Sequence, residues 1–75
     1  MDEKKYIERL GQHIKELRKK KGISQIDLAY DCDFEKQNMR RIEAGKTNPT
    51  IKTLLKIAKA LNISISELVK NFDEK

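Results

Sequence analysis

The 75-residue sequence predicts a compact all-α fold, a single bundle of five helices. Apolar residues recur three or four positions apart along most of the chain, which is the spacing of one face of an α-helix. Aromatic residues, which favour strands, make up only 5% of the sequence. The length fits one domain, residues 1–75, with a core at about residues 7–72 and flexible ends at residues 1–5 and 73–75.

The composition restricts the classes of function. Seventeen Lys and Arg residues against 12 Asp and Glu residues give a net charge of +5, which favours an anionic partner. Cys32 is the only cysteine, so an internal disulfide is excluded, and His13 has no partner at metal-ligand spacing. We therefore expect no metal and no cofactor. No apolar run is long enough to span a membrane and no signal-peptide pattern is present, so we expect a cytoplasmic protein.

The first helix is predicted from an apolar face made of Ile7, Leu10, Ile14 and Leu17. Gly11 lies inside this helix and should cost about 1 kcal/mol relative to Ala, which a close approach of another helix would compensate. The basic run at residues 18–21 favours the negative end of the helix dipole, and Gly22 suits the C-terminal cap.

The next stretch is predicted to form two short helices joined by a tight turn. The first helix spans about Gln25–Cys32 with Ser24 as its N-terminal cap, and the second spans about Lys36–Ala44. Asp33 can form the turn because aspartate tolerates left-handed backbone geometry better than most L-residues.

The helix expected at residues 36–44 has two different sides. Met39 and Ile42 lie three residues apart on the inward side. The outward side carries Gln37, Arg40 and Arg41. These side chains are rich in hydrogen-bond donors, which suit the base edges and phosphates of a nucleic-acid duplex. On the residues alone, solvated surface charge is an equally good interpretation of the two arginines.

Two further helices are predicted in the last third of the chain. Thr50 caps the fourth, which ends at Asn62. Its apolar stripe consists of Ile51, Leu54, Leu55, Ala58 and Leu61. Ser64 and Glu67 form a capping box for the fifth. The apolar residues of the fifth helix are Ile65, Leu68, Val69 and Phe72.

Three segments, in this order and spacing, resemble the phage-repressor (Cro/repressor, XRE-type) helix-turn-helix family. They are LGQHIKELRKKKGISQIDLA, RRIEAGKTNPT and IKTLLKIAKALNISISELV. The resemblance extends from about Ile7 to Val69 and implies a lambda-repressor-like DNA-binding domain. In that family the helix expected at residues 36–44 is the recognition helix and enters the major groove.

The resemblance implies three sets of residues with defined roles. Base contacts fall to Lys36, Gln37, Asn38, Arg40 and Arg41. Phosphate contacts fall to Gln25, Lys46, Thr47 and Asn48. An internal ion pair is expected between Arg18 and Glu43, because each faces the apolar side of its helix and buried charges are rarely tolerated unpaired.

Two residues depart from the family pattern. Asp33 replaces the usual turn glycine, and Glu35 replaces the common Ser or Thr before the recognition helix. Glu35 has two interpretations, as a cap of that helix or as an acceptor for cytosine, and we favour capping.

The resemblance implies a sequence-specific transcription regulator of the repressor or restriction–modification controller type that binds double-stranded operator DNA. A homodimer is expected, because one recognition helix reads too few base pairs for a unique site. The candidate interface is Ile65, Val69 and Phe72, although this helix could instead only close the core. Asp27 and Asp31 form an acidic pair, and in some family members such a patch touches RNA polymerase.

Two other classes of function stand beside DNA binding. The first is a protein-binding module, such as a toxin-neutralising antitoxin, in which DNA binding is secondary. The exposed i,i+4 pair Ile26 and Tyr30 would then be a partner contact, although it could equally be a local surface pair. The second is an enzyme, which we reject because the sequence offers no nucleophile–base pair, no phosphate-binding glycine loop and no paired carboxylates.

Overall fold

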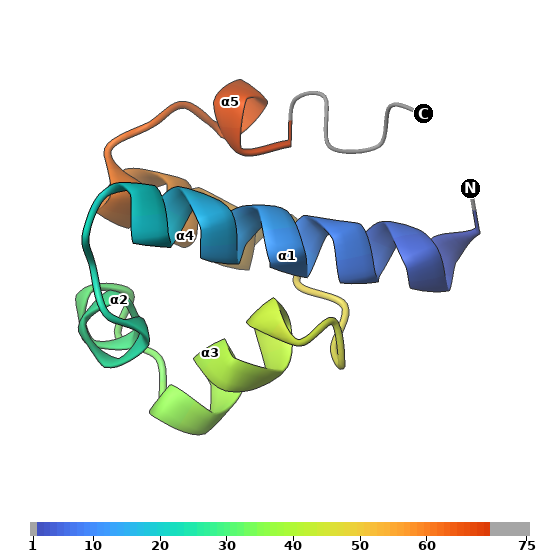
Figure 1. The fold of residues 1–75 in the computed structure, drawn as a ribbon, viewed down its shortest axis with the longest axis horizontal. Coiled ribbons are helices and arrows are strands. Elements are labelled where there is room, and N and C mark those ends of the chain that lie inside the picture. Colours follow the sequence, from blue (N-terminus) through green and yellow to red (C-terminus); the bar gives the residue numbers. More distant parts are fainter. Residues whose placement is uncertain (1, 70–75) are drawn as a thin grey trace.

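The computed structural model describes residues 2–69, which form five α-helices and no β-strand (Figure 1). The helices are α1 (Glu3–Lys20), α2 (Gln25–Asp31), α3 (Lys36–Glu43), α4 (Ile51–Leu61) and α5 (Ile65–Val69). The predicted all-α fold with five helices is therefore confirmed. Phe72 and the tail at 73–75 lie outside the described residues.

The start of α1 corrects one prediction. Residues 3–5 were expected to belong to a flexible end, but α1 begins at Glu3. Asp2 is the N-terminal cap, and its side chain accepts a hydrogen bond from the backbone N–H of Lys5 at 2.8 Å. This cap satisfies one of the amides that a helix N-terminus otherwise leaves without a partner, which extends the helix by a turn.

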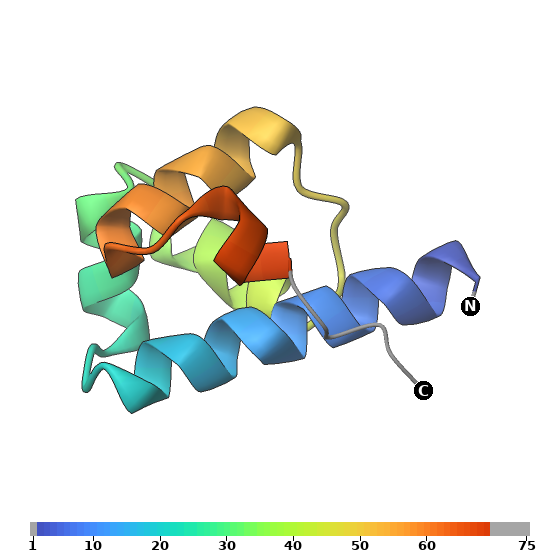
Figure 2. The same cartoon turned by 90° about the horizontal axis from the view of Figure 1, so that it is seen from above.

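The long helix α1 lies between two groups of helices. In Figure 1, α2 and α3 lie on one side of α1 and α5 lies on the other. Seen from above, α5 lies over the space between α1 and α4 (Figure 2). Helix α1 contacts α2, α3 and α5, and α4 is held by its contacts with α2 and α5.

The core draws at least one fully buried side chain from each helix. These side chains are Ile14, Leu28, Met39, Ile57, Leu61 and Leu68. Two residues of the predicted α4 stripe do not join it: Ile51 is 67% exposed and Leu55 is 49% exposed. Ile57, which the predicted stripe omitted, lies instead on the core-facing side of α4 and is fully buried.

Four helices end with a residue in the left-handed conformation. These residues are Gly22, Asp33, Gly45 and Asn62, with φ between 60° and 72°. After each of them, the next N–H donates to the carbonyl five residues earlier, at 2.8–3.2 Å. This is the Schellman arrangement, which satisfies carbonyls at the end of a helix. The prediction that Asp33 turns the chain through left-handed geometry is thus confirmed.

At Gly11, α1 approaches the last turn of α3 closely. A Cβ atom at this position would meet the carbonyl oxygens of Ile42 and Glu43, the second at 2.9 Å. The close helix approach expected from the sequence is therefore present, and only glycine leaves room for it.

Candidate nucleic-acid interface

The two sides of α3 have opposite environments. Met39, Ile42 and Glu43 are buried, at 0%, 2% and 6% exposure. The five residues that the resemblance assigned to base contacts are all exposed: Lys36, Gln37, Asn38, Arg40 and Arg41. The structure thus places these side chains on the exterior of the bundle, where their donors face away from the core.

One hydrogen bond orders the outward side of α3. Nη1 of Arg40 donates to Oε1 of Gln37 at 3.0 Å, across one turn of the helix. The neighbouring cations Lys36 and Arg41 are exposed as well. The outward side of α3 is therefore a surface of amide and cationic donors, with one amide oxygen already bonded to a guanidinium.

Glu35 corrects another prediction. It occupies the N-cap position of α3, in extended geometry, but its side chain makes no capping hydrogen bond. Its longer side chain fits the cap less well than those of Ser, Thr, Asp or Asn. Ser24, by contrast, accepts from the Asp27 N–H at 3.0 Å and caps α2.

Behind the exposed face, Arg18 of α1 and Glu43 of α3 form a buried ion pair. Nε of Arg18 lies 2.7 Å from Oε2 of Glu43, and Nη2 donates to Oε1 at 3.0 Å. Nη1 of Arg18 donates to the carbonyl of Ile23 at 2.8 Å. Two parallel N–H···O bonds fix both position and angle. The pair therefore orients α3 relative to α1.

Gln25, the first residue of α2, also contacts this ion pair. It is half-buried, and its Nε2 donates to Oε1 of Glu43 at 2.9 Å. The same amide carries a second N–H. Sequence reasoning missed this contact, because Gln25 and Glu43 are far apart in the chain and their residue types predict no pairing.

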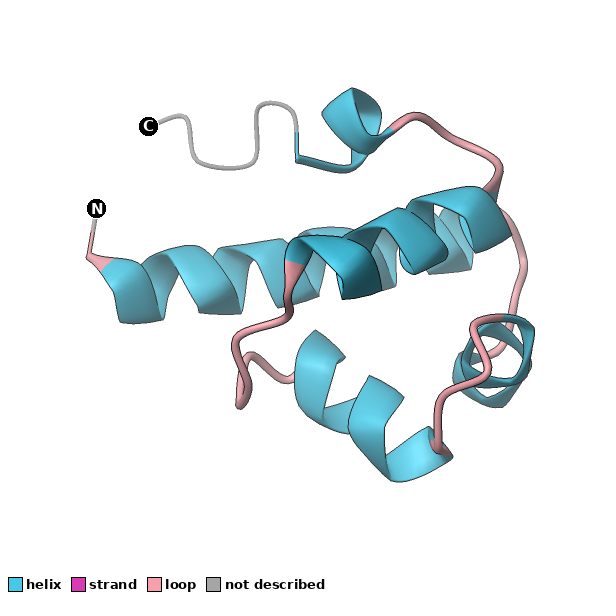
Figure 3. Cartoon of the chain, turned by 180° about the vertical axis from the view of Figure 1, so that it is seen from behind, coloured by secondary structure: helices cyan, strands magenta, loops and turns pink. Residues whose placement is uncertain are grey.

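The α2–α3 turn and the α3–α4 loop lie at opposite ends of α3 (Figure 3). In the α3–α4 loop, Lys46 and Asn48 are exposed and Thr47 is half-buried. Gly45 holds the loop against α1, because a Cβ atom there would lie 2.7 Å from the Cα of Glu8. The residues predicted to contact phosphate thus fall into two places, Gln25 beside the buried pair and the other three in the loop.

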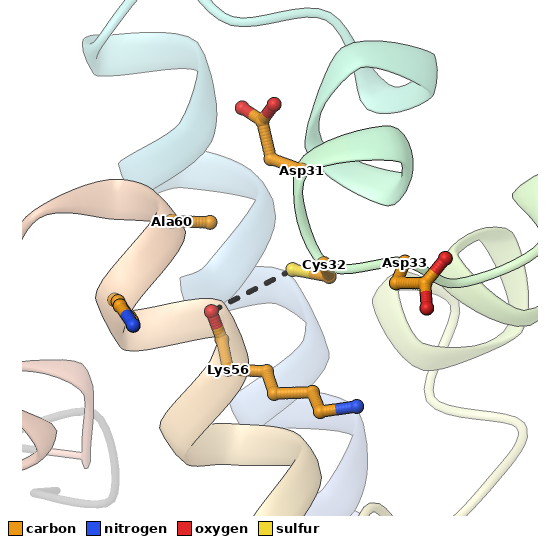
Figure 4. A pocket seen from close by; sticks show the side chains of 6 residues that line it. Asp31, Cys32, Asp33, Lys56 and Ala60 are labelled. Carbon is orange, nitrogen blue, oxygen red and sulfur yellow. Dashed lines mark hydrogen bonds between the residues drawn. The ribbon is translucent and has the colours of Figure 1, made fainter.

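A hollow surrounds Cys32 between the end of α2 and α4 (Figure 4). Its Sγ donates to the carbonyl of Lys56 at 3.7 Å, and Cys32 is 3% exposed. Burial, reinforced by the charge of Asp31, raises the pKa of the Cys32 thiol from 9.0 to about 11. A thiol that stays protonated at neutral pH is a poor nucleophile and metal ligand.

Within residues 2–69, no three His, Cys, Asp or Glu side chains are grouped so that they could hold a metal ion. In the same part of the chain, no helix has the length and apolar character needed to cross a membrane.

The arrangement of α2, α3 and the turn between them defines a helix-turn-helix domain. The first helix is buried on one face, the second follows a short left-handed corner, and the outward side of the second is polar. A family model described as "Helix-turn-helix" matches residues 14–68. The chain belongs to this family.

Several known proteins are similar over most of the chain. An uncharacterized HTH-type transcriptional regulator, y4dJ, from Sinorhizobium fredii is 36% identical over 99% of this chain and 92% of its own length. Control protein C.MunI from a Mycoplasma species is 36% identical over 88% of this chain and 90% of its own length. The crystal structure of the restriction–modification controller C.AhdI from Aeromonas hydrophila superposes with a TM-score of 0.80 at 35% identity, covering 83% of this chain and 94% of that one.

Proposed function

We propose that this protein is a sequence-specific transcription regulator that binds double-stranded operator DNA in the cytoplasm and reads the major groove with α3. The observation that carries the proposal is the exposure of five donor-bearing side chains on one side of α3, while its other side is fixed in the core. The names of its relatives support the same function, since they include a transcriptional regulator and control proteins. We assign the chain a binding role and no catalysis.

The contacts divide into two kinds. Lys36, Gln37, Asn38, Arg40 and Arg41 would face base edges, because α3 presents them together on its outward side. Gln25, Lys46, Thr47 and Asn48 would position the protein on phosphates. For Gln25, the group that would reach phosphate is the second N–H of its amide, because the first is bonded to Glu43.

Salt dependence and sequence selection test this division. Binding to duplex DNA should weaken with salt, with a log–log slope of about −0.9 per phosphate contact. Lys46→Ala should lower the affinity for all sequences and reduce the slope by about 1, whereas Arg41→Ala should relax the preference at one or two base positions. Lys5→Ala, at an exposed site on α1, is the matched control for lost charge. An unchanged selected motif with Arg41→Ala would remove Arg41 from base reading.

We also propose a homodimer, with the two copies of α3 about 34 Å apart in successive major grooves. Ile65 and Val69 were the predicted interface residues in the described part of the chain, and both are half-buried against the core. Leu55 is 49% exposed beside Ile65 in a groove between α4 and α5. These side chains form the apolar surface that a second copy would cover.

Light scattering tests the interface. Leu55→Glu should shift the particle to monomer mass, because a carboxylate buried without a partner opposes association. Tyr30→Glu, on the exposed side of α2, should leave the dimer intact. An unchanged mass for Leu55→Glu would move the interface elsewhere.

A second candidate function rests on α2. Ile26 is 61% exposed and Tyr30 is 84% exposed, and the acidic residues Asp27 and Asp31 stand beside them. Such a surface fits a protein partner, either RNA polymerase during activation or a toxin neutralised by this chain. Failure to bind any duplex at low salt would favour the protein-binding module over the regulator.

A further inference from the structure

The pairing of Gln37 with Arg40 has a consequence for the choice of base. We propose that Arg40 determines specificity by fixing the amide of Gln37, so that α3 prefers guanine to adenine at the base that Gln37 faces. This inference rests on the proposed function. Gln37 and Arg40 are both exposed on the outward side of α3, and Nη1 of Arg40 donates to Oε1 of Gln37 at 3.0 Å.

A free glutamine amide suits adenine. It accepts from the N6–H group with its oxygen and donates to N7 with its nitrogen. In this protein the oxygen of Gln37 already accepts from a guanidinium. A second positive hydrogen, that of adenine N6, would approach an oxygen whose charge is partly neutralised, beside a cation that repels it. The pairing therefore weakens the contact that would select adenine.

The same pairing suits guanine. Guanine presents two acceptors, O6 and N7, and no donor in this part of the major groove. The Nε2 of Gln37 carries two N–H donors, and the guanidinium of Arg40 keeps N–H donors beyond the one used in the pair. Together the two side chains offer adjacent donors to adjacent acceptors.

The charges around the pair act in the same direction. Lys36 and Arg41 flank it with two further exposed cations. Glu43 is the only acid in α3, and its carboxylate points inward to Arg18 and Gln25. Within α3, the outward side therefore has no acidic acceptor for cytosine; the nearest acid is the exposed Glu35 at the N-cap, two residues before Gln37.

Selection from a random duplex pool, followed by competition titrations, tests the proposal. Gln37→Ala locates the base that Gln37 faces, because the preference is lost there. We expect the unaltered protein to select guanine at that base, and Arg40→Ala to change the preference to adenine by roughly tenfold, within the range of one bidentate contact. Arg41→Ala removes the same charge without touching Gln37, and should leave guanine preferred at that base while altering another.

Three results would overturn the proposal while the proposed function stands. The unaltered protein could select adenine or a pyrimidine at that base, Arg40→Ala could keep guanine, or Gln37→Ala could change no base preference. Circular dichroism of each variant checks that the helices are intact. If the unaltered protein selects no motif at any salt concentration, the proposed function itself fails and this inference falls with it.

Discussion

The buried ion pair gives the sharpest test of how α3 is held. Glu43 accepts three side-chain hydrogen bonds, two from Arg18 and one from Gln25, at 2.7–3.0 Å. Arg18 is only 7% exposed, so replacing Glu43 with Leu leaves its buried guanidinium with no opposite charge. Leaving one partner of a buried pair uncompensated costs about 3–5 kcal/mol. For a domain of this length the free energy of unfolding is about 4–11 kcal/mol, so the change removes a large part of it.

Urea unfolding followed by circular dichroism measures this loss. We expect Glu43→Leu and Arg18→Met each to lower the free energy of unfolding by about 3–5 kcal/mol. The double variant should lose far less than the sum, because no buried charge then lacks a partner. Glu16→Leu, at an exposed site on α1, is the matched control and should change stability by less than about 0.5 kcal/mol.

Two outcomes would refute this reasoning. A loss below about 1 kcal/mol for Glu43→Leu would mean that Arg18 finds water or another partner at little cost. A double variant as unstable as the sum of the two single variants would mean that each side chain acts through packing alone.

Three further predictions concern the backbone and the thiol. Gly11→Ala should lower stability by about 1–3 kcal/mol in thermal unfolding, since its Cβ would meet the Ile42 carbonyl; an unchanged melting temperature would contradict the close approach. Asp33→Gly should raise stability by up to about 1 kcal/mol, because relief of left-handed strain exceeds the added flexibility, and a lower melting temperature would contradict this. Because burial raises the pKa of Cys32 to about 11, the thiol ionises at lower pH in the unfolded chain than in the folded protein. As pH rises from 9 toward 11, the unaltered protein should therefore lose more of its free energy of unfolding than Cys32→Ala does. An equal loss in the two proteins would contradict this.

Much of the fold could be predicted because the signals that place α2 and α4 are local. Ser24 and Thr50 accept hydrogen bonds from backbone N–H groups three residues later, at 3.0 and 3.1 Å. Residues suited to left-handed geometry stand where these helices end, at Asp33 and Asn62. Caps and left-handed corners depend on neighbouring residues only, so the sequence contains them.

The surface of α4 shows what local pattern leaves undecided. Ile51 and Leu55 satisfy the helical period, as do Leu54, Ile57 and Ala58. The pattern is therefore wider than the face that the core covers. Which edge of it stays exposed depends on where α2 and α5 pack, which is a tertiary fact.

In the candidate interface, too, some features follow from the sequence and others do not. That Arg40, Arg41 and Gln37 lie on the outward side of α3 follows from helical spacing. The bond from Arg40 to Gln37 and the bond from Gln25 to Glu43 do not follow, because each depends on a choice among side-chain rotamers. The base preference that we infer depends on the first of these bonds, so residue types alone would have suggested adenine for Gln37.

The two sides of α3 can therefore change independently. Its position is fixed from behind, by the ion pair of Glu43 with Arg18 and by the contact of its last turn with Gly11. Its outward residues are exposed, and the hydrogen bond from Arg40 to Gln37 stays within the helix. Substitutions there should alter the selected DNA sequence while changing stability by less than about 0.5 kcal/mol. A fold of this size can accommodate many base preferences because the groups that hold the reading helix are separate from the groups that read.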